Sequence, residues 1–293
     1  MGRFSKLETD QSSDEPQPGN ASGLELPKVR KRGSAQAEEE VAESYDRLHY
    51  EVRAEDAFYE GDYQQSLRLY SRAMGEENNS PGPWVGQVLA LSAMKQYREA
   101  AVWASRAAAM FPQEPRILSV QGLTLACNQA PHRAIACSDT ALKYVTPDTE
   151  SFVWAVRGRI LGLSENANAT FCLEKAMQLR PHDDWKIAAW IGLMLLDDKK
   201  YTRAGSFLAK AVEANPGNAH LWRSLAIAYE RSGLNDQAMK AFQSAMEINP
   251  NDRAAFDGIT RLVSIPLPVR LWRKLTGKDK PRDPFNKEEP PSS

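Results

Sequence analysis

Cysteine and histidine are scarce in this chain of 293 residues, which contains three cysteines and four histidines. An odd number of thiols does not suit a disulfide framework, so Cys127, Cys137 and Cys172 are expected to pack as small apolar residues within helices. The histidines show no HExxH or comparable metal spacing. These counts predict neither a metal site nor a disulfide-stapled domain.

Motifs of catalysis and of membrane insertion are missing as well. The sequence has no Gly-rich phosphate loop and no GxSxG elbow. No apolar run reaches the roughly 18 residues of a membrane span, and the first residues lack the apolar core of a signal peptide. The formal net charge of −1 gives no reason to expect a nucleic-acid partner. We therefore expect a cytoplasmic protein with no catalytic residue, no cofactor and no nucleic-acid binding.

One thirty-residue stretch, "LWRSLAIAYERSGLNDQAMKAFQSAMEINP", shows what the chain does contain. Apolar residues at every third or fourth position put one stripe on each of two short helices, and Ala226, Ala238 and Ala245 leave room for close approach. Gly233 lets the chain turn, and Pro250 ends the second helix because it has no backbone donor. The stretch predicts a helical hairpin that cannot bury both of its faces alone.

The same order of bulky and small residues recurs along the chain at close to 34 residues. The copy that contains Gly158 is one residue shorter between its helices. The first copy is weaker than the others. The copies lie near residues 47–80, 81–114, 115–149, 150–183, 184–218 and 219–252.

These residues resemble the tetratricopeptide repeat family over about Arg47 to Pro250. The resemblance implies an all-α fold, a right-handed helical solenoid of about six helix-turn-helix repeats within residues 43–265. After Pro250, "DRAAFDGITRLVSI" predicts a C-terminal capping helix over 253–265, which covers the last apolar face of the array. The family's concave face usually grips a peptide or helix of another protein.

The resemblance also assigns a partner-binding groove to positions on the first helix of each copy. It implies an apolar floor, with acidic residues at the N-terminal end and basic residues toward the C-terminal half. Arg116, Arg159 and Arg223 are interpreted as exposed cations that meet an amphipathic or acidic segment of a partner. The predicted groove residues are Glu51, Glu55, Tyr59, Val85, Leu89, Arg116, Leu123, Phe152, Arg159, Lys186, Leu193, His220, Arg223 and Ile227.

The two ends of the chain differ from the array. Residues 1–42 are polar and poor in large apolar side chains, so they are predicted to be a disordered tail. Residues 266–293 begin with a short basic amphipathic pattern, "PLPVRLWRKLTGK", and are predicted to end in a disordered tail. That pattern has two interpretations: Trp272 folds back to cap the solenoid, or Arg270, Trp272, Arg273 and Lys274 make weak contact with an anionic membrane.

Two functions follow from these features. The leading hypothesis is a non-catalytic scaffold or adaptor that binds a peptide or helix of another protein in its concave groove. The alternative is an adaptor tethered to a membrane surface by the basic amphipathic segment. The sequence names neither the partner nor the pathway.

Overall fold

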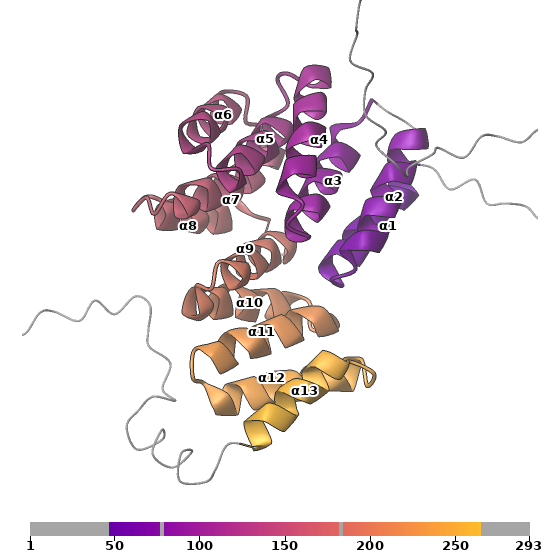
Figure 1. Ribbon diagram of the computed structural model, residues 1–293, viewed down its shortest axis with the longest axis vertical. Helices are drawn as coiled ribbons and strands as arrows, with labels where there is room; N and C mark the ends of the chain where they lie inside the picture. Colours follow the sequence, from indigo (N-terminus) through magenta and orange to yellow (C-terminus); the bar gives the residue numbers. More distant parts are fainter. Residues whose placement is uncertain (1–46, 77–78, 182–183, 265–293) are drawn as a thin grey trace, which may run out of the picture. The chain divides into compact units, whose positions relative to one another are not determined.

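A computed structural model describes residues 47–76, 79–181 and 184–264 of the chain (Figure 1). Every regular element in this part is an α-helix. The helices are α1 (Arg47–Tyr59), α2 (Tyr63–Glu76), α3 (Pro81–Ala93), α4 (Tyr97–Met110), α5 (Pro115–Cys127), α6 (Pro131–Lys143), α7 (Pro147–Leu163), α8 (Ala169–Leu179), α9 (Lys186–Asp197), α10 (Tyr201–Ala214), α11 (Ala219–Arg231), α12 (Asn235–Ile248) and α13 (Arg253–Val263).

The starts of several helices are encoded by proline or by a capping side chain. Pro81, Pro115 and Pro131 begin their helices, where a residue without a backbone donor costs nothing. The side chains of Asn218 and Asp252 accept hydrogen bonds from the backbone N–H groups of the first turns of α11 and α13. Local sequence therefore fixes where these helices begin.

The turn inside each helix pair has one left-handed residue, always two positions after the first helix ends. The φ angles at these positions lie between 53° and 85°. Two of the positions are glycine, for which the conformation has no steric cost, and four hold ordinary residues. In chain order they are Gly61, Lys95, Gln129, Glu165, Lys199 and Gly233, spaced by about 34 residues. The expectation that the copy with Gly158 is shorter between its helices is wrong, because five residues separate α7 from α8 and three separate α9 from α10.

Helices within a pair approach closely because small residues lie at their contact. A Cβ added at Gly158 would lie 2.4 Å from Leu173 Cδ2, and one at Gly192 would lie 2.6 Å from Leu208 Cγ. Ala226 and Ala245, which the sequence assigns to such places, are fully buried. The alternation of bulky and small residues therefore determines how closely the two helices of a pair pack.

Successive pairs stack because the first helix of each pair packs against the second helix of the pair before it. Gly86 of α3 faces the ring of Tyr70, and Gly258 of α13 faces the ring of Phe242. One continuous core cluster includes Leu123, Ile160 and Leu221, so it extends over several pairs. The predicted all-α tetratricopeptide-type solenoid is confirmed for the described residues, whereas the tails and their boundaries at 42 and 265 lie outside the described part and stay predictions.

Candidate functional site

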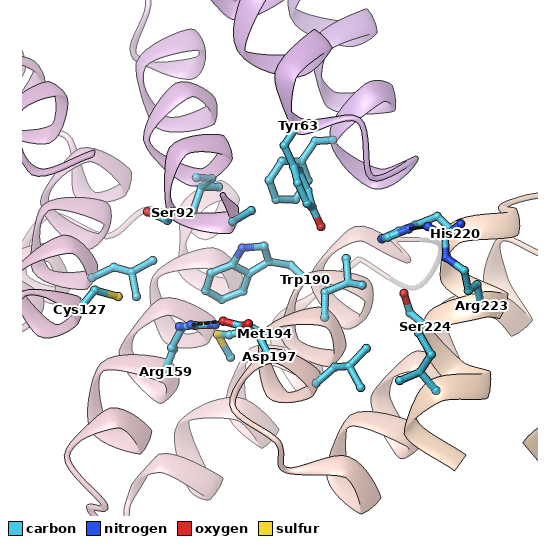
Figure 2. A pocket seen from close by; sticks show the side chains of 17 residues that line it. Tyr63, Ser92, Cys127, Arg159, Trp190, Met194, Asp197, His220, Arg223 and Ser224 are labelled. Atoms are coloured by element: carbon cyan, nitrogen blue, oxygen red, sulfur yellow. Dashed lines mark hydrogen bonds and ion pairs between the residues drawn. The ribbon is translucent and has the colours of Figure 1, made fainter. Parts of the chain in front are cut away.

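A cavity of about 430 Å³ lies where the first helices of successive pairs face one another. Helices α3, α5, α7, α9 and α11 each contribute side chains to it (Figure 2). Phe58 and Tyr63, from the end of α1 and the start of α2, also line it. The volume falls within the range of pockets that hold ligands or anchoring side chains.

The cavity wall is mainly apolar. Leu89, Leu123 and Ile227 come from three different first helices, and α9 adds Trp190 and Leu193. Such a wall favours an apolar occupant, because removing the apolar side chains of the wall from water lowers the free energy. Figure 2 shows the Trp190 ring near the middle of this wall.

Arg159 forms one of the two polar clusters at the cavity. Its Nη2 lies 3.3 Å from Oδ1 of Asp198 and 3.7 Å from Oδ2 of Asp197. Lys95 Nζ reaches the other oxygen of Asp197 at 2.7 Å. Burial raises the pKa of Asp198, although the Arg159 charge opposes the shift. The Arg159 side chain is only 10% exposed, and the neighbouring carboxylates neutralise its charge.

Arg223, His220 and Asp252 form the second cluster. Arg223 donates one hydrogen bond to Asp252 Oδ2 at 2.6 Å and a second to His220 Nδ1 at 2.7 Å. Because arginine can only donate, Nδ1 accepts and the imidazole proton is on Nε2. Nε2 is buried and has no hydrogen-bond partner among the described residues. Desolvation by burial, reinforced by the Arg223 charge and opposed by Asp252, lowers the pKa of His220 to about 4.

The turn between α1 and α2 contacts helices that are far away in the sequence. Tyr59 Oη donates to the backbone oxygen of Lys186 at 3.1 Å, and Asn218 Nδ2 donates to the backbone oxygen of Tyr59 at 3.1 Å. Lys186 Nζ pairs with Glu55 at 2.5 Å. A Cβ at Gly61 would lie 2.7 Å from the His220 ring. The first helix pair therefore meets α9 and α11 at the edge of the cavity.

The structure brings half of the predicted groove residues together. Leu89, Leu123, Arg159, Leu193, His220, Arg223 and Ile227 line the cavity. Glu55, Tyr59 and Lys186 instead form the contact between the first pair and α9.

The remaining predicted groove residues do not line the cavity. Val85 is buried in the core, and the Phe152 ring lies 6.2 Å from that of Trp190. Arg116 pairs with Glu114 at 2.8 Å, and Glu51 lies against Gly82 at the start of α3.

The three arginines that were interpreted as exposed cations each pair with a carboxylate, and the side chains of Arg159 and Arg223 are only 10% and 25% exposed. Arg116 pairs with Glu114, Arg159 with Asp198 and Arg223 with Asp252. In two of the three pairs the carboxylate lies in a turn after a different helix, so position within one copy did not reveal it.

Sequence reasoning also missed several lining residues. Trp190 and Met194 lie close to the predicted groove residue Leu193 without having been assigned to the groove, and Tyr63 belongs to a second helix. The repeat pattern describes contacts between neighbours in the array, so it contains no signal for the approach of the first pair to α11. Only the position of Trp190 and Met194 near Leu193 could have indicated their place.

No cluster of three or more His, Cys, Asp or Glu residues suited to a metal ion occurs in residues 47–76, 79–181 and 184–264. Within the same ranges, every helix is too short or too polar to cross a bilayer. Burial raises the pKa of the thiols of Cys127, Cys137 and Cys172, which keeps them protonated and weakly nucleophilic.

Comparison with known proteins points to one family. Residues 195–262 match the model of the tetratricopeptide repeat. This segment contains α10, α11 and α12 and most of α13, and the same pairing of helices extends back through the described chain.

Two curated relatives match over part of the chain. Anaphase-promoting complex subunit 3 of Schizosaccharomyces pombe is 30% identical over 100 residues, which cover 34% of this chain and 15% of that protein. BBSome complex member BBS4 of Xenopus tropicalis is 31% identical over 91 residues, which cover 31% of this chain and 17% of that protein. The match thus spans less than a fifth of the length of each relative.

Solved structures of similar helical proteins were also found. The hetero-tetramer Cut9-Hcn1 of the APC/C gives a TM-score of 0.45 at 13% identity, over 75% of this chain and 43% of that chain. TTC0263, a protein of Thermus thermophilus, gives 0.44 at 16% identity, over 75% of this chain and all (100%) of that chain. At these scores neither likeness supports a functional argument, and the fold is established by the helix pairs of this chain.

Proposed function

Because the chain is a tetratricopeptide repeat protein, we propose that it is a non-catalytic interaction scaffold that binds a segment of another protein on the shared face of its first helices. The observation that carries this proposal is the apolar cavity to which five successive first helices contribute. A surface built jointly by several helix pairs suits an extended or helical ligand better than a reaction centre, which needs groups of matched pKa.

The partner segment is proposed to be amphipathic, with apolar side chains as its anchors. Leu89, Leu193 and Ile227 offer apolar contacts, whereas Arg159 and Arg223 are already neutralised by carboxylates. An acidic side chain of the partner is proposed to meet Arg116 outside the cavity, because this side chain is 36% exposed and remains accessible although it also pairs with Glu114. Acidic residues therefore adjust specificity, and apolar burial supplies most of the affinity.

The names of the relatives agree with a role in assembly. One is a subunit of the anaphase-promoting complex and the other a member of the BBSome complex. We propose that this chain likewise works as part of a protein assembly, with a partner defined by apolar anchors.

The test uses the full chain and a displayed library of natural peptides. Binders are selected, and their dissociation constants are measured with the parent, with Ile227→Arg in the cavity wall, and with Val102→Arg as a matched control. Val102 lies on α4 and is 51% exposed. We expect Ile227→Arg to weaken binding at least about tenfold, because it puts a charge where an anchor must be desolvated.

The control should bind like the parent, and circular dichroism should show the same helicity in all three proteins. Peptides that bind Ile227→Arg as tightly as the parent would place the interaction elsewhere. The alternative of a membrane-tethered adaptor depends on Arg270, Trp272, Arg273 and Lys274, which lie outside the described residues, and it is tested below.

A further inference from the structure

Helix α13 buries one face and exposes the opposite one. Ala255 and Leu262 are almost completely buried, and Gly258 packs on the ring of Phe242 in α12. On the other side, Phe256 is 56% exposed and Val263 is 61% exposed. The preceding helix pair therefore leaves Phe256 and Val263 of α13 exposed.

The exposed side of α13 matches a side that is covered elsewhere in the array. Gly86 of α3 and Gly258 of α13 occupy the same place, since each faces an aromatic ring of the preceding second helix. Three residues of α3 are compared by their positions in the sequence relative to Gly86: Trp84 lies two residues before it, and Val88 and Leu91 lie two and five residues after it. All three are buried, with exposures of 7%, 0% and 0%, in a cluster with alanines of α4.

The counterparts of these three residues in α13 are Phe256, Thr260 and Val263, and all of them are exposed. Among the described residues, α3 packs against its second helix α4, whereas α13 has no second helix within them. The face through which a first helix binds its own second helix is thus uncovered in α13.

We propose that residues 268–275 of the chain bind this face as the second helix of a seventh pair. Their sequence, "PVRLWRKL", places Leu271, Trp272 and Leu275 on one stripe at helical spacing. Arg270, Arg273 and Lys274 fall on the opposite side, where they stay in water.

The start of the segment also fits a second helix. Pro268 takes the first helical position, as Pro131 does in the second helix α6. Four residues, 264–267, separate it from the end of α13, compared with three between α5 and α6 and five between α7 and α8.

Covalent attachment favours this occupant over others. A short linker holds the segment near the face at an effective concentration of the order of millimolar, so no outside partner is needed. Isolated apolar side chains on a surface are common, but here the exposed residues continue a pattern that is buried in α3. The seventh pair would end the array with a basic outer surface, from Arg270, Arg273 and Lys274.

Hydrogen exchange of the α13 backbone amides in the full chain tests this proposal. Val263→Arg puts a charge under the proposed helix, and Val102→Arg makes the same change on an exposed position of α4. We expect Val263→Arg to speed exchange in α13 about tenfold and Val102→Arg to leave it unchanged. Trp272→Asp, which disrupts the other side of the contact, should have the same effect as Val263→Arg.

In the double variant Val263→Arg, Trp272→Asp, the amides of α13 should exchange no faster than in either single variant, because the two substitutions break the same contact. Exchange in Val263→Arg that equals exchange in the parent overturns the proposal. A parallel flotation assay with phosphatidylserine vesicles covers the competing occupant. Vesicle binding that depends on Trp272, with α13 exchange insensitive to Trp272→Asp, also overturns the proposal and supports the membrane-tethered adaptor.

Discussion

The buried imidazole of His220 should make the stability of the array depend on pH between about 6.5 and 4. In the folded chain the pKa of His220 is lowered to about 4, while an unfolded histidine titrates near 6.5. As the pH falls through this window, the unfolded state binds a proton that the folded state does not bind. Protonation therefore favours unfolding, and the full stability is present only above the unfolded pKa.

The size of the effect follows from the width of the window. One pKa unit corresponds to about 1.4 kcal/mol, so lowering the pH from 7 to 5 should cost about 2 kcal/mol. The groups that face the ring are Arg223, whose charge opposes imidazolium, and Asp252, whose carboxylate is already bound to Arg223. The ring also lies against Gly61, so a charged ring would disturb the contact between the first pair and α11.

The assay is urea unfolding at pH 7 and pH 5 at constant ionic strength, with the parent and with His220→Gln. Glutamine does not titrate, so carboxylates elsewhere contribute equally to both proteins. Between these two pH values the parent should lose about 2 kcal/mol more than the variant. An identical pH dependence in the two proteins would refute the reasoning, because the imidazole would then titrate normally in the folded chain.

Two further predictions concern glycine. Gly192→Ala should lower the free energy of unfolding by about 1–3 kcal/mol, because the new Cβ would lie 2.6 Å from Leu208 Cγ and 3.1 Å from the Leu208 backbone nitrogen. Gly75→Ala is the control, since the new Cβ would have no heavy atom within 4 Å, and it should be neutral or stabilising in the same thermal melt. Lys199→Gly should be neutral or raise the free energy of unfolding by up to about 1 kcal/mol. Glycine adopts the left-handed conformation at φ 59° without steric cost, and this gain offsets the greater backbone entropy of glycine in the unfolded chain. A marked decrease in the free energy of unfolding, measured in urea, would contradict this prediction.

The pairing of helices could be predicted from the sequence because it depends on neighbours. Ala226, Ala238 and Ala245 lie at predicted packing positions, and all three are fully buried. Gly233 has the positive φ expected of a turn glycine, but the left-handed conformation of Lys199 at the same place gave no signal, since lysine rarely adopts it.

The cavity could be predicted only in part, because its polar groups depend on contacts between elements that are distant in the chain. The groove position of Arg223 follows from the repeat, whereas its carboxylate partner Asp252 lies 29 residues later. Tyr59 meets Lys186 across 127 residues, and no periodic pattern encodes that distance. The repeat pattern thus identifies the helical face, whereas long-range contacts determine which residues on that face can still contact a partner.

The contact of Tyr59 with Lys186 and Asn218 has a consequence for the evolution of the chain. Repeat arrays usually change length by duplication or loss of a unit, since each unit touches only its neighbours. Here an inserted or deleted pair between α2 and α9 would shift α9 relative to Tyr59 by the rise and rotation of one unit, and the hydrogen bonds of Tyr59 would be lost. A change in the number of units between Tyr59 and α9 would therefore break these long-range hydrogen bonds, whereas a change after α13 would leave them intact.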